Sequence, residues 1–238
     1  MANNDDYHLY VKFYPNSVIA EAFRSLRTNL VLTDIDKGLH SIVITSAERG
    51  EGKSTVCANL AVIMAQAEKR VLLIDCDLRL PSQDKLFNLP RNGGLTSIIS
   101  HLEDEGELVF EESLPGLTVI GSGPPPPNPS EFLGSARFRS FLRRTEKHYD
   151  MVIIDAPPIG LVTDAAILSS MVDGTVLVLD AQYGHRNVAI RAKAALDQVN
   201  ANVIGVVLNN VRPEKSAYYA YKQGAEQYRA ISEDGNAA

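Results

Sequence analysis

The sequence of 238 residues lacks any apolar run approaching the roughly 18 residues that a membrane-spanning helix requires. Its first residues, MANNDDYHLY, are too polar for a signal peptide, so a cytoplasmic protein is expected. Cysteine is also scarce. Cys57 and Cys76 stand in apolar segments, which predicts buried free thiols and argues against a disulfide framework or a metal site. The net charge of −6 argues against nucleic-acid binding, because phosphate backbones are bound by clustered lysine and arginine.

Six short apolar segments alternate with longer segments of helix length. The expected strands are residues 41–46, 71–75, 117–122, 151–155, 175–180 and 203–209, and the expected helices between them are 55–69, 131–147 and 187–199. Most of the strands are too continuously apolar for a sheet with one wet face, so both faces must be covered. This pattern predicts a doubly wound α/β fold with a mainly parallel sheet, whose ligands bind beyond the carboxyl ends of the strands.

Two flanking regions depart from this alternation. Before the first strand, Ser17 is placed to cap a helix over residues 17–32. The apolar stripe expected to pack this helix on the body of the protein consists of Ile19, Ala22, Phe23, Leu26 and Leu30. After the last strand the chain is polar and has no apolar period, which predicts a domain over residues 1–211 and a flexible tail over 212–238. The proline run at 123–129 predicts a stiff connector.

The strongest functional signal is the glycine-rich segment SAERGEGKST at 46–55, which follows an apolar strand and precedes a helix. Backbone N–H groups of such a turn wrap phosphate oxygens, the Lys53 ammonium adds positive charge, and the Ser54 hydroxyl reaches Mg²⁺. The segment predicts ATP and Mg²⁺ as ligands and a P-loop NTPase fold with a deviant Walker A motif, since Ala47 replaces the usual first glycine. The expected nucleotide-binding residues here are Ala47, Glu48, Arg49, Gly50, Glu51, Gly52, Lys53, Ser54 and Thr55.

Two further strand ends supply carboxylates. The segment VLLIDCDLRLP places Asp75 and Asp77 two residues apart, so on an extended strand end both side chains point to the same side. The segment MVIIDAPP ends a buried strand with Asp155. Because Mg²⁺ prefers oxygen ligands, the three aspartates and the glycine-rich segment together predict one Mg-nucleotide site. The candidates for contacting adenine are Asn209 and Arg212.

Three segments in this order resemble the kinase domain of the bacterial protein tyrosine kinases (BY-kinases) that control capsule and exopolysaccharide synthesis. They are the P-loop, VLLIDCDLRLP and MVIIDAPP. The resemblance spans most of the chain. It includes EAFRSLR at 21–27, which matches the family's E-x-x-R-x-x-R oligomerisation motif, together with GLTS at 94–97 and SGPPPPNPSEFL at 122–133. One departure is Arg49, where the family often has proline, while Ala47 agrees with the family.

The resemblance implies a protein-tyrosine kinase that transfers a phosphoryl group from ATP to tyrosine. It implies catalytic roles for Lys53, Asp75 and Asp77, of which Asp75 is the candidate base toward the tyrosine hydroxyl. It also implies that Mg²⁺ is held by Ser54, Asp77 and Asp155.

Tyrosine is unevenly distributed along the chain. None occurs between Tyr14 and Tyr149, whereas four lie in the tail. We expect autophosphorylation of this cluster, which consists of Tyr218, Tyr219, Tyr221 and Tyr228. We expect another subunit to be contacted by Glu21, Arg24 and Arg27, because these residues lie largely away from the apolar stripe.

The resemblance also implies partners. It implies a ring, with an octamer as one candidate size, in which each tail enters the neighbour's active site. It implies a membrane activator of polysaccharide export, separate or fused, that recruits the kinase to the inner face of the cell membrane. A cognate phosphotyrosine phosphatase would reverse the modification. The chain would then be either a stand-alone subunit or a domain of a longer protein.

Two other functions are compatible with the sequence. One is a nucleotide-switch ATPase of the chromosome-partitioning or division-site kind, which shares this P-loop class and sheet. Those proteins have a lysine at the position of Glu48, whose carboxylate cannot replace a cation beside phosphates, and their tails are not rich in tyrosine. The other is a non-catalytic ATP-binding scaffold for polysaccharide assembly.

Overall fold

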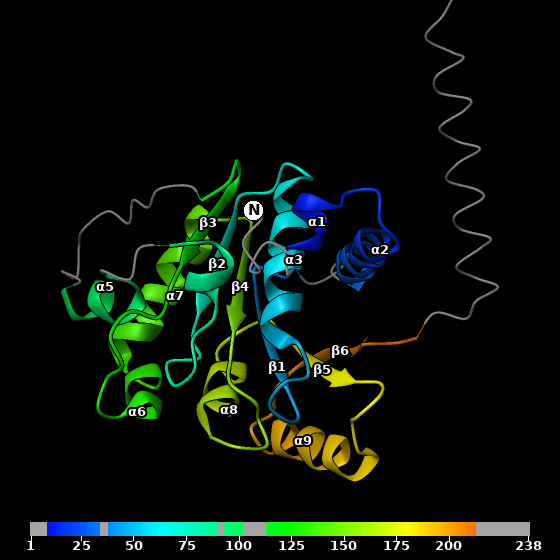
Figure 1. Ribbon diagram of the computed structural model, residues 1–238. Coiled ribbons are helices and arrows are strands. Elements are labelled where there is room, and N and C mark those ends of the chain that lie inside the picture. Colours follow the sequence, from blue (N-terminus) through cyan, green and yellow to red (C-terminus); the bar gives the residue numbers. More distant parts are fainter. Residues whose placement is uncertain (1–8, 34–37, 90–92, 102–112, 213–238) are drawn as a thin grey trace, which may run out of the picture.

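The computed structural model of the protein describes residues 9–33, 38–89, 93–101 and 113–212 (Figure 1). In this part of the chain, parallel strands form a six-stranded sheet in the order β3-β2-β4-β1-β5-β6. The strands are β1 (Ser41–Ser46), β2 (Val71–Asp75), β3 (Leu117–Ile120), β4 (Met151–Asp155), β5 (Gly174–Asp180) and β6 (Val203–Asn209). The prediction of a doubly wound parallel sheet is confirmed.

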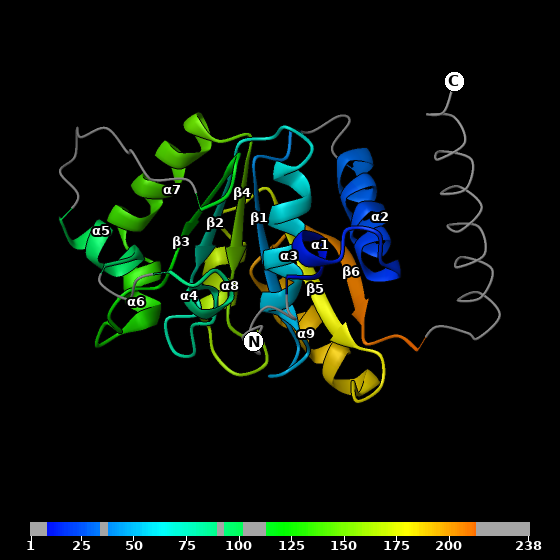
Figure 2. The same cartoon turned by 45° about the horizontal axis from the view of Figure 1, so that its top comes forward.

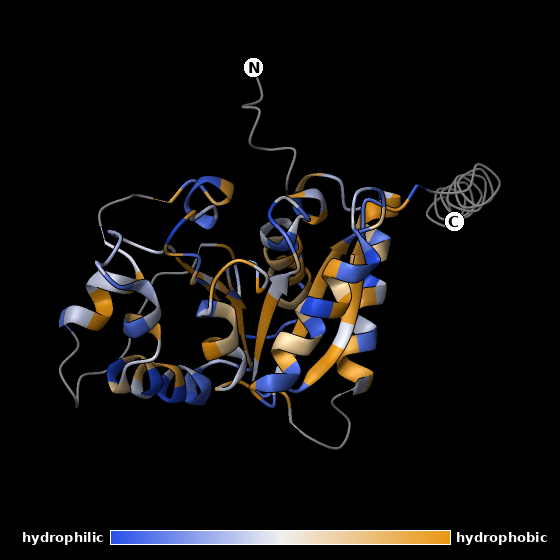
Figure 3. Cartoon of the chain, turned by 90° about the horizontal axis from the view of Figure 1, so that it is seen from below, coloured by the Kyte–Doolittle hydropathy of each residue, from blue (hydrophilic) through white to orange (hydrophobic). Residues whose placement is uncertain are grey.

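Helices cover both faces of the sheet (Figures 1 and 2). One face carries α1 (Tyr10–Phe13), α2 (Val18–Thr33) and α3 (Lys53–Ala65), with α4 (Gln83–Leu86) near the end of β2. The other face carries α5 (Leu95–His101), α6 (Pro129–Leu133), α7 (Ala136–His148), α8 (Asp164–Ser169) and α9 (Arg186–Gln198). Figure 3 shows the resulting concentration of hydrophobic residues on the strands, between the two helical layers.

Two hydrophobic cores result from the strand alternation. In β1, Val43 packs into the core beneath α5 to α9, whereas Ile42 and Ile44 pack into the core beneath α1 to α3. All six residues of β1 are buried, as expected for a central strand covered on both sides. The carboxyl ends of β1, β2 and β4 therefore meet at one edge of a rigid platform.

The strand predictions match the structure closely, because each apolar run ends at a polar residue. β1, β2, β4 and β6 have the predicted bounds, β5 begins one residue earlier, and β3 ends at Ile120 rather than at residue 122. The single helix predicted over 131–147 is wrong. It is divided into α6 and α7 at Gly134, and the Ser135 hydroxyl caps α7 by accepting a hydrogen bond from Phe138 N at 3.2 Å.

The α2 helix begins as predicted, since the Ser17 hydroxyl accepts a hydrogen bond from Ala20 N at 3.1 Å. The predicted stripe is partly wrong. Phe23, Leu26 and Leu30 pack into the core as predicted, whereas Ile19 and Ala22 are exposed and Ala20 is fully buried instead. The packed side of α2 lies against α3.

Two predictions from composition can be compared with the structure. Both cysteines are buried free thiols, as predicted, and burial raises the pKa of Cys57 and of Cys76. Within the described ranges, no helix combines the length and the apolarity that crossing a membrane demands.

Candidate nucleotide and magnesium site

The loop between β1 and α3 has the backbone of a phosphate-binding turn. Gly50 and Gly52 have φ values of 86° and 87°, in the left-handed region that favours glycine. A Cβ atom at Gly52 would overlap the side-chain amide of Asn209, so this position has no room for another residue. The loop delivers the chain into the N-terminus of α3, where unpaired backbone N–H groups favour an anion.

The loop is held in place by a buried carboxylate. Glu51 is 5% exposed, and its side chain accepts hydrogen bonds from Glu48 N at 2.7 Å and from Asp180 N at 3.1 Å. The Asn209 amide donates to the Glu51 carbonyl oxygen at 3.0 Å. Glu51 and Asn209 thus join the P-loop to the ends of β5 and β6. The sequence pointed to both residues as nucleotide contacts and gave no signal for this supporting role.

Lys53 and two of the three predicted aspartates come together at the strand ends. Lys53 Nζ lies 2.9 Å from Asp77 Oδ2, 3.2 Å from Asp155 Oδ1 and 3.0 Å from Ser54 Oγ. Burial of Lys53 opposes its charge, but the attraction of Asp155 and Asp77 outweighs burial and raises the pKa of Lys53. The ammonium group is therefore a fixed positive charge among carboxylates.

Asp75 lies beside this cluster in a different environment. It is fully buried, and its carboxylate accepts hydrogen bonds from Asp77 N at 3.1 Å and from Ser82 N and Gln83 N at 2.9 Å each. Burial, reinforced by the neighbouring charge of Asp155, raises the pKa of Asp75 to about 8. Asp77 lines the cavity described below and Asp75 does not, so the role of Asp75 as a base stays a prediction.

Gln83 is a site residue that the sequence analysis missed. Its side-chain amide donates to Asp155 Oδ2 at 2.8 Å and to the Ser54 carbonyl oxygen at 3.1 Å. It therefore orients Asp155 and ties α4 to the start of α3. A lone glutamine eight residues after Asp75 carries no recognisable sequence signal.

A cavity of about 340 Å³ opens beside the P-loop, within the usual size range of ligand pockets. Its lining residues are Arg49, Gly50, Gly52, Lys53, Ser54, Thr55, Asp77, Arg79, Leu80, Ser82, Pro157, Pro158, Leu161 and Val162. Six of the predicted nucleotide-binding residues thus line this cavity with Asp77, and one of the six is Arg49, the residue at the family's usual proline position. Ala47, Glu48, Glu51, Asn209 and Arg212 lie outside this lining. Arg212 instead donates to Gln182 Oε1 at 3.2 Å.

The residues present fit a magnesium ion. Oxygens of Ser54, Asp77 and Asp155 all contact one cation, the Lys53 ammonium, so they converge on a single point. Among the described residues, no three His, Cys, Asp or Glu side chains form a metal cage by themselves. This is the donor set expected for Mg²⁺ bound with nucleotide, since that ion uses one or two carboxylates and completes its shell with phosphates and waters.

One ion pair outside the sequence-based set shapes the cavity wall. Arg79 Nε lies 3.0 Å from Asp164 Oδ2, and Asp164 is fully buried at the start of α8. The Ser130 hydroxyl donates to the same carboxylate. The hydrogen bond and the charge of Asp164 raise the pKa of Arg79. This network fixes the loop after Asp77 against α6 and α8.

The remaining predicted residues lie away from this site. Arg24 pairs with Glu21 at 2.8 Å, and Arg27 donates to the Ile63 carbonyl oxygen at 3.4 Å. All three side chains remain partly exposed, and their contact with another subunit stays a prediction. The four tail tyrosines lie outside the described residues.

Comparison with known proteins decides the family. Residues 42–234 match the family described as the CobQ/CobB/MinD/ParA nucleotide binding domain. The tyrosine-protein kinase YwqD of Bacillus subtilis is 41% identical over 207 residues, which cover 87% of this chain and 87% of that protein. The chain belongs to the bacterial tyrosine-protein kinases.

Solved structures agree with this membership. The chimerical protein CapA2B2 superimposes with a TM-score of 0.81 at 38% identity, covering 87% of this chain and 91% of that one. The kinase domain of Escherichia coli tyrosine kinase ETK gives a TM-score of 0.78 at 31% identity, covering 87% and 82%. The resemblance to BY-kinases and the P-loop fold class are therefore confirmed, and the site described above is the candidate kinase site.

Proposed function

We propose that this BY-kinase family member transfers the γ-phosphoryl group of Mg-ATP to tyrosines of its own tail, Tyr218, Tyr219, Tyr221 and Tyr228. The observation that carries the proposal is the convergence of Lys53, Asp77 and Asp155 on one cavity at the mouth of the P-loop. In this proposal residues 1–211 form the kinase domain and residues 212–238 are the substrate segment.

The residues of the site have separate tasks in the transfer. The tyrosine oxygen attacks the γ-phosphorus, the bond from that phosphorus to the β–γ bridging oxygen breaks, and ADP leaves. Lys53 and the backbone N–H groups of the P-loop stabilise the charge on the transferring group. Ser54, Asp77 and Asp155 would hold a bound Mg²⁺, which would supply positive charge against the phosphates. The phenolic proton is lost to water or to a nearby carboxylate, for which Asp75 is the candidate.

The cavity rim supports an aromatic acceptor. Leu80 and Leu161 both line the cavity, yet they are 52% and 63% exposed. Exposed leucines beside a charged phosphate site offer apolar surface to a substrate, and a tyrosine ring carries its reactive hydroxyl at the end of such a surface. This arrangement favours a tyrosine kinase over a switch ATPase, whose nucleophile is water.

Mapping of phosphotyrosine by mass spectrometry tests the proposal. The purified chain incubated with Mg-ATP should carry phosphate on tail tyrosines, whereas Asp77→Asn, which keeps the shape and removes the charge, should cut the rate by about 100-fold or more. ATP hydrolysis without phosphotyrosine would indicate a switch ATPase. ATP binding with neither product would indicate a scaffold.

We also propose that transfer occurs between subunits of a ring assembled through Glu21, Arg24 and Arg27. The apolar residues Ile19, Val31 and Leu32, which are 44%, 50% and 57% exposed on α2, support a contact there. Mixing an Asp77→Asn acceptor with a donor whose tail tyrosines are all phenylalanine should phosphorylate the acceptor. Light scattering should show a smaller particle for Arg24→Ala plus Arg27→Ala, and phosphorylated wild type should also be smaller than unphosphorylated protein.

The biological setting belongs to the same proposal. By analogy with its relatives, the chain would act in capsular or exopolysaccharide synthesis and export, on the inner face of the membrane. A membrane activator, separate or fused, would recruit it, and a phosphotyrosine phosphatase would reset it. Co-purification from detergent-solubilised membranes tests the first of these contacts.

A further inference from the structure

The α7 helix has a charge opposite to that of the chain. Its sequence, ARFRSFLRRTEKH, contains five lysine and arginine residues and one glutamate, whereas the whole chain has a net charge of −6. One side of the helix is buried through Phe138, Phe141 and Leu142. The basic side chains are left on the outer face, remote from the P-loop cavity, whose lining contains none of them.

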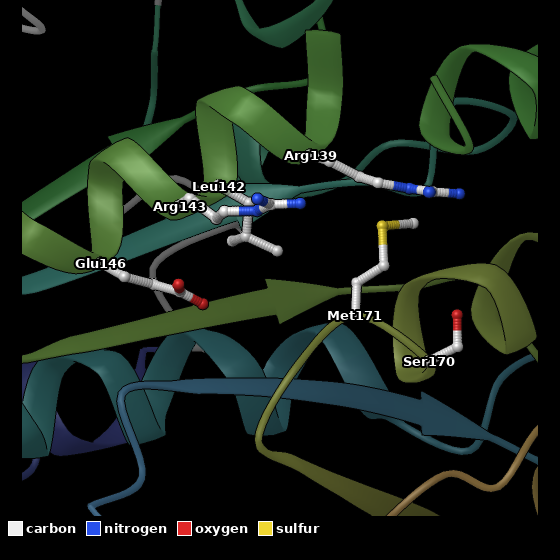
Figure 4. Close-up of a pocket in the computed structure, with 6 residues that line it drawn as sticks. All are labelled: Arg139, Leu142, Arg143, Glu146, Ser170 and Met171. Carbon is white, nitrogen blue, oxygen red and sulfur yellow. The ribbon is translucent and has the colours of Figure 1, made fainter. Parts of the chain in front are cut away.

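A second cavity, of about 330 Å³, lies between α7 and the end of α8 (Figure 4). It is lined by Arg139, Leu142, Arg143, Glu146, Ser170 and Met171. Arg139 and Arg143 are one helical turn apart, and Figure 4 shows their guanidinium groups on the same side of α7, facing the side chain of Met171. The cavity thus has two cations and one carboxylate, that of Glu146, at its edge, with the apolar side chains of Leu142 and Met171 below them, so the net charge of its lining is positive.

The two arginines are not neutralised within the described part of the chain. Arg24, Arg70 and Arg79 each pair with a carboxylate, at 2.8, 2.7 and 3.0 Å. The guanidinium groups of Arg139 and Arg143 have no hydrogen bond or ion pair with another described residue. Two unpaired guanidinium groups one turn apart form a fork suited to bidentate binding of a phosphate group.

The size and the apolar floor of the cavity indicate a ligand larger than a bare phosphate. At about 30 Å³ per water molecule, its volume corresponds to roughly ten waters, which leaves room for a side chain as well as an anion. Leu142 is 2% exposed and, with Met171, supplies an apolar floor. Methionine sulfur and guanidinium planes both make favourable contacts with aromatic rings.

We propose that this cavity binds a phosphorylated tyrosine of the tail, in the segment SAYYAY at 216–221, with the phosphate between Arg139 and Arg143 and the ring on Met171. The proposal rests on the proposed function, because the kinase site makes this ligand. Residues 213–238 contain three basic and four acidic residues, so the unmodified tail carries almost no net charge. Each phosphate adds about −1.5 to −2 charges, so only the modified tail is attracted.

Through this cavity the kinase would bind its own phosphorylated product at a site separate from the kinase site. A phosphorylated tail held at α7 is kept away from the P-loop cavity, where an unmodified tyrosine could take its place. A concave site with an apolar floor also suits a side chain better than a flat membrane surface, for which a broad exposed basic face is needed.

A binding experiment with synthetic peptides tests this proposal without requiring the chain to act as a kinase. Fluorescence anisotropy would compare labelled EKSAYYAYKQG, phosphorylated at Tyr219, with the unmodified peptide and with a phosphoserine version, on the full unphosphorylated chain. The phosphotyrosine peptide should bind at least about tenfold more tightly than either, since the unmodified peptide lacks the hydrogen bonds to a charged phosphate and the phosphoserine peptide lacks the ring contact.

The variants decide where binding occurs. Arg139→Ala and Arg143→Ala should each weaken the phosphopeptide by about tenfold or more, whereas Arg137→Ala, on the same helix but outside the cavity, should change the affinity less than about twofold. Equal losses in all three variants would show nonspecific charge attraction and overturn the proposal. Binding to phosphatidylserine vesicles that depends on Arg139 and Arg143, without preference for the phosphopeptide, would overturn it in favour of a membrane surface.

Discussion

Replacement of Lys53 should reveal its structural role as well as its catalytic one. The ammonium group lies 2.9 Å from Asp77 and 3.2 Å from Asp155, and the two carboxylates are 4% and 0% exposed. In the described part of the chain, no other lysine or arginine forms an ion pair with either carboxylate. Lys53→Met therefore leaves buried charges without a partner, while its similar length preserves the packing.

The size of the effect follows from the burial of the pair. Removing one partner of a buried ion pair costs about 3–5 kcal/mol, because the remaining charge stays desolvated. For a domain of this size each kcal/mol lowers the melting temperature by about 2–4 °C, so the Lys53→Met protein should melt about 6–20 °C below wild type. It should still fold at 25 °C and lack tail phosphorylation, because the charge that stabilises the transferring phosphoryl group is gone.

Thermal unfolding followed by circular dichroism, with and without excess Mg²⁺, measures the effect, because a ligand that binds only the folded state stabilises it. Mg²⁺ should stabilise Lys53→Met more than wild type, because in wild type the tethered ammonium competes for the oxygens of Asp77 and Asp155. Lys53→Arg keeps the charge and should lose less stability. Lys85→Met, at an exposed lysine of α4, is the matched control and should melt like wild type.

Two results would refute this reasoning about stability, and a third would refute the assignment of the kinase site. A Lys53→Met protein that melts within about 2 °C of wild type would show that the buried carboxylates do not depend on the ammonium. Equal stabilisation of both proteins by Mg²⁺ would show that the lysine and the metal do not share these oxygens. Persistent phosphotyrosine on the folded variant would remove this cavity as the kinase site.

Three further perturbations probe the supports of the site. The pKa of Asp75 is raised to about 8 from an ordinary 3.8, so protonation of Asp75 favours the folded state. The stability that this protonation contributes is complete below about pH 4 and is lost as the pH rises through 8. Urea titrations should show wild type losing about 4 kcal/mol between pH 5 and 9, and Asp75→Asn should flatten this slope; parallel slopes would contradict the assignment. Gly52→Ala should abolish ATP binding by calorimetry, because its Cβ would displace Asn209, and an unchanged affinity would exclude that packing. Glu51→Gln should weaken ATP binding by about tenfold, because an NH₂ group would face the Glu48 or Asp180 N–H donor. Glu51→Asp keeps the charge but shortens the side chain, so its affinity for ATP should show whether side-chain length also matters.

The sequence by itself determined the sheet and the outline of the nucleotide site. Four strands were predicted to the residue, because a strand buried on both faces needs a continuous apolar run and ends where that run meets polar residues. The glycine-rich loop is a local structure, encoded by neighbouring residues. The approach of Asp77 and Asp155 followed from topology alone, since the carboxyl ends of parallel strands meet at one edge.

Only the tertiary structure decided which side chains support that site. Glu51 meets the Asp180 N–H across 129 residues of chain, Arg79 meets Asp164 across 85, and Gln83 reaches Asp155 across 72. Such pairs leave no spacing pattern, because the fold and not the local chain sets their distance. The same holds for the face of α2 that packs on α3 and for the cavity between α7 and α8. The local sequence specifies which elements form, and the packing of those elements specifies which of their residues meet.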